Sequence, residues 1–143
     1  MSIVKYDKYY TEDAKACGDP YPAFVEFFER HVRTPVSVLD LGCGQGRDAL
    51  FIARLGHTVF GVGISEVGVR QMLDTARKEG LDIEAVVADA STYRSRCKYD
   101  VVLLDRVVHQ LSDRAEQERL LGNAARLTRK DGGGTGRAGV RRD

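Results

Sequence analysis

The residues with the clearest chemical potential form a short turn, in which an aspartate precedes three regularly spaced glycines. Asp40 lies near the end of the apolar run 36–41, and Gly42, Gly44 and Gly46 follow it. Glycine lets the backbone approach a ligand closely, because no side chain stands in the way. A glycine-rich turn between a strand and a helix is typical of nucleotide binding. The stretch VSVLDLGCGQGRDAL therefore predicts a ligand that contains a nucleoside.

Two ligand classes fit the glycine spacing, and the charge of Asp40 favours one of them. Gly44, Gly46 and Ala49 satisfy the dinucleotide pattern G-x-G-x-x-A, so the spacing alone leaves a dinucleotide open. A carboxylate at Asp40 would repel a pyrophosphate and attract an ammonium group. A ligand with a cationic amino-acid end, a ribose and an adenine suits the turn better. We therefore expect S-adenosylmethionine as the cofactor.

The apolar residues of the chain recur with periods that predict alternating strands and helices. Such alternation produces βαβ units and a parallel sheet, and strands rich in Val, Ile and Leu indicate that helices cover both faces. The predicted fold class is α/β, a doubly wound and mostly parallel sheet. Strands are expected at 36–41, 57–63, 82–89 and 99–105, and helices at 21–32, 46–56, 65–80 and 112–130, with Ser65 and Ser112 as caps and Gly80 as a stop.

Composition excludes several other kinds of protein. The chain has 143 residues, the size of one domain, and a formal net charge of +1. We expect neither nucleic acid nor membrane as a partner, since there is no strong basic excess and no long apolar run. Cys17, Cys43 and Cys97 lack the spacing of zinc ligands, so no metal is expected. Their odd number favours a reduced, cytoplasmic setting. His31 and His57 are expected at the surface or as caps.

Four stretches together resemble the class I S-adenosylmethionine-dependent methyltransferases. They are LDLGCGQGRDAL, TVFGVGIS, VVADA and YDVVLLDRVVHQL, and the greatest similarity is to the small bacterial tellurite-resistance and thiopurine-type group. The resemblance runs from about residue 36 to Gly133 and implies a Rossmann-like sheet of strand order 3-2-1-4-5-7-6. It divides the chain into an N-terminal helical segment over the cofactor site (1–35), a cofactor-binding α/β core (36–130) and an irregular Gly/Arg-rich tail (131–143).

The resemblance also implies which residues contact the cofactor, all of them at the carboxyl ends of strands. The glycine turn forms the wall around the methionine and ribose, Ile64 packs on the adenine, and Asp89 accepts a hydrogen bond from the adenine amino group. Cys43, inside the turn, is otherwise a small apolar filler. The full predicted set is Asp40, Gly42, Cys43, Gly44, Gly46, Gly63, Ile64, Asp89, Ala90 and Asp105.

Gly63 departs from the family pattern. The family ends its second strand with an acid that binds both ribose hydroxyls, and this chain has Gly63 there. Loss of such charge-assisted hydrogen bonds weakens cofactor binding by roughly 1.5–3 kcal/mol. Glu66, one helical turn later, is expected to be solvated. Gly63→Asp is expected to restore the acid, and tighten binding, without adding bulk to the core.

The acceptor side of the site is predicted from the fourth strand. Asp105 and Arg106 are expected to border the sulfonium and the acceptor pocket, and His109 to serve as a general base. His109 fits equally well as a histidine packed against Leu111. The predicted function is methyl transfer to a small-molecule acceptor. The alternatives are a non-catalytic module that binds S-adenosylmethionine or S-adenosylhomocysteine and, further off, an NAD-binding oxidoreductase.

The residues after Gly133 do not read as a strand. Glycine and arginine dominate them, with a single valine, whereas the fold requires a fifth strand beside 99–105. We therefore expect the sheet to lack its last strands and 99–105 to present an unpaired edge. Such edges recruit other chains, so we also expect self-association through the edge and little or no methyl transfer.

Overall fold

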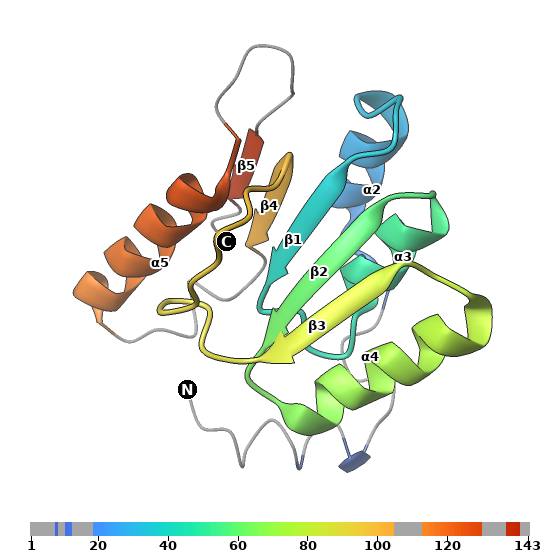
Figure 1. The fold of residues 1–143 in the computed structure, drawn as a ribbon, viewed down its shortest axis with the longest axis horizontal. Coiled ribbons are helices and arrows are strands. Elements are labelled where there is room, and N and C mark those ends of the chain that lie inside the picture. Colours follow the sequence, from blue (N-terminus) through green and yellow to red (C-terminus); the bar gives the residue numbers. More distant parts are fainter. Residues whose placement is uncertain (1–7, 9–10, 13–18, 105–112, 130–136, 141–143) are drawn as a thin grey trace.

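The computed structural model describes residues 8, 11–12, 19–104, 113–129 and 137–140, the last as backbone only. Their centre is a single five-stranded sheet in the order β3-β2-β1-β4-β5 (Figure 1). All neighbouring strands run parallel, so their carboxyl ends share one edge. The predicted doubly wound α/β class is confirmed. The strands are β1 (Ser37–Leu41), β2 (Thr58–Gly63), β3 (Ile83–Val87), β4 (Val101–Leu104) and β5 (Arg137–Val140).

Helices cover both faces of the sheet, as the apolar strands require. One face packs against α2 (Pro22–Arg30), α3 (Arg47–Arg54) and α4 (Glu66–Glu79), and the other against α5 (Arg114–Leu127) (Figure 1). Successive strand residues point to opposite faces, so a strand between two layers is apolar at every position. Val38 and Leu39 are both fully buried, one in each of the two cores.

The helix ends follow local capping rules. The Ser65 hydroxyl accepts a hydrogen bond from the Gly68 backbone N–H at 3.0 Å, and Gly80 ends α4 in the left-handed conformation, as predicted. The cap of α5 lies one residue further along than expected. Asp113 holds that position and accepts from the Ala115 N–H at 2.9 Å, whereas Ser112 lies outside the described residues.

The prediction for the end of the chain is wrong in one respect, because residues 137–140 form β5. This strand pairs in parallel with β4, from Val101 opposite Arg137 to Leu104 opposite Val140. Backbone N–H and C=O groups make the ladder, and residues with weak strand propensity still supply them. Consequently β4 lies between β1 and β5 and is paired on both sides, while self-association stays a prediction. None of the described strands is antiparallel.

Candidate cofactor site

The glycine turn between β1 and α3 has a backbone that only glycine adopts readily. Gly42, Gly44 and Gly46 have φ angles of 87°, 56° and 86°, in the left-handed region that other residues avoid. The Val62 carbonyl of β2 accepts hydrogen bonds from the Gly42 and Cys43 N–H groups at 2.6 and 3.0 Å. The turn is thereby held at the carboxyl edge of the sheet, next to the positive end of the α3 dipole.

Asp40 is the most unusual residue beside this turn. Its relative exposure is 4%, and no hydrogen bond reaches its carboxyl group within the described part of the chain. Burial raises its pKa from 3.8 to about 8; the Asp48 carboxylate also raises it, and the Arg47 guanidinium opposes the shift. A buried polar group without a partner is costly, and such groups commonly await a ligand or water. Asp40 is thus available to a polar or cationic ligand.

A buried ion pair lies at the start of α3, and the sequence analysis missed it. The Arg47 guanidinium donates to both Asp48 carboxylate oxygens, at 3.2 and 2.8 Å, and the two side chains are only 10% and 7% exposed. The backbone N–H of Tyr21, the N-cap of α2, donates to Asp48 at 3.0 Å. Asp48 therefore joins the start of α2 to the helix that follows the glycine turn. Two opposite charges directly after the third glycine were the available signal.

The structure contradicts the expectation that an acid at position 63 adds no bulk to the core. A Cβ atom on Gly63 would lie 2.9 Å from the Cys43 Sγ and 2.9 Å from the Val69 Cγ2. A Cβ on Gly61 would lie 3.1 Å from the same sulfur. Cys43 thus occupies space left by two glycines of β2, and any side chain at Gly63 requires Cys43 and Val69 to move.

The predicted adenine side of the site lies in the loop after β3. The Asp89 Oδ1 accepts hydrogen bonds from the Ser91 N–H and hydroxyl, at 2.9 and 2.7 Å. Ala90 is buried, and its carbonyl accepts from the Asn123 side-chain amide of α5 at 3.0 Å. Asn123 also donates to the Tyr93 carbonyl at 2.9 Å, so one buried side chain fixes the loop. In the sequence, Asn123 could have been recognised as a buried polar residue because it lies in the apolar stripe of a helix.

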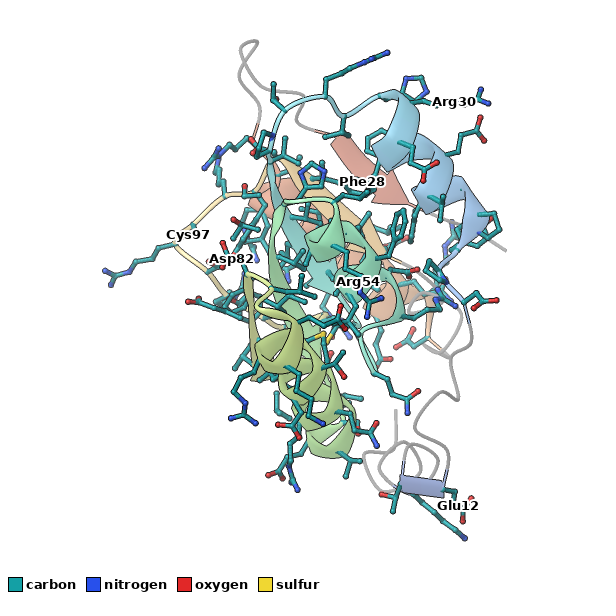
Figure 2. All side chains as sticks on the ribbon, turned by 90° about the vertical axis from the view of Figure 1, so that its right-hand side faces the viewer. Glu12, Phe28, Arg30, Arg54, Asp82 and Cys97 are labelled. Atoms are coloured by element: carbon teal, nitrogen blue, oxygen red, sulfur yellow. The ribbon has the colours of Figure 1, made fainter. Side chains whose placement is uncertain are left out.

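The remaining predicted residues have different outcomes. Ile64 is half-buried just after β2, and Glu66 is exposed and pairs with Arg70 at 3.4 Å, as expected for a solvated first-turn glutamate. Cys97 lies in an exposed loop (Figure 2). The predicted acceptor-side residues Asp105, Arg106 and His109 lie outside the described residues. In the described ranges no helix is long and apolar enough to span a membrane.

The comparison with protein families decides between the ligand classes. Residues 38–132, which include the glycine turn and the ends of β1 to β4, match the family model described as "Methyltransferase domain". The chain belongs to this methyltransferase family. Its Rossmann-like fold is therefore confirmed, as is S-adenosylmethionine as the cofactor at the level of the family.

Parts of the chain are also similar in sequence to individual methyltransferases. The chain is 34% identical over 70 residues to the "Probable S-adenosyl-L-methionine-dependent methyltransferase TehB" of Haemophilus influenzae, a match that covers 49% of this chain and 24% of that protein. It is 35% identical over 96 residues to a ubiquinone biosynthesis O-methyltransferase of Caulobacter, covering 62% of this chain and 38% of the relative. The chain thus matches between a quarter and two fifths of the length of these relatives.

A solved structure shares the fold. The crystal structure of TehB from Haemophilus influenzae superimposes with a TM-score of 0.69 over 87% of this chain and 42% of that chain. The identity over this superposition is 24%, so it bears on the fold alone. The predicted resemblance to the tellurite-resistance group is confirmed by the sequence match to TehB given above.

Proposed function

We propose that this chain binds S-adenosylmethionine at the carboxyl edge of the sheet and transfers its methyl group to a small-molecule acceptor. Asp40 carries the proposal: its carboxyl group is buried, without a hydrogen-bond partner among the described residues, and next to three left-handed glycines. The ammonium group of a methionyl end would stabilise the ionised form of this carboxyl group, whereas the pyrophosphate of a dinucleotide would oppose its ionisation.

The residues present fit this cofactor in most respects. The glycine turn would hold the methionyl and ribose portions, Ile64 would face the adenine, and the Asp89–Ala90 backbone would lie beside it. When bound, the cofactor supplies a methyl group on a positively charged sulfur, already activated for displacement. The chain's own task is then to orient the acceptor and exclude water. Arg106 and His109 remain the predicted residues on the acceptor side.

Gly63 supports a second candidate function, a binding module without catalysis. The ribose hydroxyls have no carboxylate at position 63, and the space above Gly63 is filled by Cys43 and Val69. Weaker cofactor binding follows, by roughly 1.5–3 kcal/mol, or about 10- to 150-fold in Kd. A chain that binds S-adenosylhomocysteine but methylates no acceptor would fit this alternative.

Calorimetric titration tests the proposal. We expect S-adenosylhomocysteine to bind and NAD not to bind. Asp40→Asn should weaken S-adenosylhomocysteine by about 10-fold or more while changing adenosine little, because adenosine lacks the ammonium group. The matched control is Asp74→Asn, which removes an exposed carboxylate of α4 that pairs with Arg77. Measurable NAD affinity without S-adenosylhomocysteine affinity would refute the assignment.

A further inference from the structure

Few of the described residues around Asp40 could stabilise a negative charge on it. On β2 and β4 its neighbours in register are Gly61 and Leu103, which carry no charge. On the same face of the sheet, α2 contributes Phe24 and Phe28 and α4 contributes Val69 and Met72 to the apolar core. Within the described part of the chain, the charged groups that act on Asp40 come from α3 and are Arg47 and Asp48.

Arg47 and Asp48 of α3 carry opposite charges, so their effects on Asp40 largely cancel. Arg47 makes two hydrogen bonds to Asp48, so its guanidinium is already paired. An ionised Asp40 would then be a second buried carboxylate beside one arginine, and an isolated buried charge is avoided by taking up a proton. The raised pKa of Asp40, about 8, agrees with this geometry.

We propose that Asp40 carries a proton in the ligand-free protein and releases it when the ammonium end of the cofactor binds, with the Arg47–Asp48 pair setting the pH of the exchange. The inference rests on the proposed function. The step is a simple proton exchange: the carboxyl O–H proton goes to the buffer, the carboxylate stays, and no bond to the cofactor forms. Arg47 and Asp48 act through Asp40 and are positioning residues.

The exchange makes binding depend on pH in a defined direction. Below pH 8 binding requires deprotonation, so the Kd of S-adenosylhomocysteine should fall by up to tenfold per pH unit as the pH rises from 6 to 8. At pH 7, below this pKa of about 8, most of the molecules carry the proton. Adenosine, which lacks the ammonium group, should bind without this dependence.

Calorimetry in buffers of different ionisation enthalpy counts the protons. The observed enthalpy of S-adenosylhomocysteine binding at pH 7 is plotted against the ionisation enthalpy of the buffer, and the slope gives the number of protons released. We expect the wild type to release most of one proton more than Asp40→Asn. The Asp40→Asn variant retains the titration of the ligand's own amino group and so subtracts it. Equal slopes in the two proteins would overturn the proposal.

Two variants of α3 should shift the exchange in opposite directions, which a structural role alone would not produce. Asp48→Asn removes the repelling carboxylate and should lower the number of protons released at pH 7. Arg47→Gln removes the opposing cation and should move the release to higher pH. Arg54→Gln, at the other end of α3 and paired with Glu79 at 2.6 Å, is the matched control and should leave the release unchanged. If Asp48→Asn does not fold, the shift in Arg47→Gln alone decides.

A measurement without ligand separates this proposal from the proposed function. The folded pKa of Asp40 lies above the unfolded one, so its stabilising effect is present below pH 3.8 and is lost as the pH rises toward 8. The urea unfolding free energy of the wild type, relative to Asp40→Asn, should therefore fall between pH 5 and 8. A constant difference over that range would refute the protonated state of Asp40. If the unfolding free energy falls in this way but S-adenosylhomocysteine does not bind, the cofactor assignment and the proton release on binding are refuted. The protonation of Asp40 in the ligand-free protein would still be supported.

Discussion

Replacing Gly63 with alanine is expected to destabilise the protein by about 1–3 kcal/mol, through a collision with one sulfur and one methyl group. The new Cβ would lie 2.9 Å from both the Cys43 Sγ and the Val69 Cγ2. Optimal contacts between such atoms are about 3.5–4.0 Å, so each overlap is roughly 0.6 Å or more. Valine is stiff about χ1, which limits how far its methyl group can move. Overpacking of this kind typically costs about 1–3 kcal/mol.

A double-mutant cycle with Cys43→Ala isolates the collision. In urea unfolding followed by circular dichroism, Gly63→Ala should cost less in the Cys43→Ala background than in the wild type, by about 1 kcal/mol. Gly122→Ala is the matched control, because it sits inside α5 and its added Cβ would meet nothing within 4 Å among the described residues outside its own stretch of helix backbone. That change should stabilise the protein by about 0.5–1 kcal/mol. Additive costs of the Gly63 and Cys43 changes would refute the packing argument.

Two further predictions concern buried polar side chains. Asn123→Ala should cost about 1–3 kcal/mol in urea unfolding and weaken S-adenosylhomocysteine binding, because the carbonyls of Ala90 and Tyr93 lose their donor; unchanged stability would contradict this role. Burial lowers the pKa of His57, whose Nδ1 accepts from the Val36 N–H at 3.1 Å, so the unfolded chain binds the proton more readily. Its contribution to stability should be complete above pH 6.5 and decline as the pH falls through that value, and His57→Gln should remove this part of the pH profile.

The sequence was sufficient to predict the features of the fold and of the site that depend on a single chain segment. Strands and helices follow from apolar periodicity, and the left-handed turn follows from Gly42, Gly44 and Gly46, because few other residues adopt that backbone. The position of Asp40 at the carboxyl edge of the sheet, where ligands bind, follows from its place at the end of a parallel strand. Membership of the methyltransferase family then confirmed S-adenosylmethionine, the cofactor that the charge of Asp40 had favoured.

The missed features depend on contacts between segments. The collision above Gly63 involves Cys43 and Val69, which lie in a turn and a helix on either side of β2 in the chain. His57, expected at the surface or as a cap, is buried because α2 packs Phe28 against it, with ring centroids 5.5 Å apart. The pairing of β5 uses backbone groups, which leave little mark on composition. No periodicity within one segment carries such information.

The position of β1 at the middle of the sheet has a consequence for the order in which the chain assembles. Its start meets the β2 side through Val36 and His57, 21 residues apart, but meets the β4 side through Ser37 and Asp100, 63 residues apart. Closing the longer loop costs roughly 1 kcal/mol more chain entropy. The glycine turn, held by the Val62 carbonyl, should therefore become ordered before β4 docks. A folding intermediate of this kind would present the turn already shaped, with Asp40 still in water and ionised, and the docking of β4 would bring Leu103 beside Asp40 and help to exclude water from it.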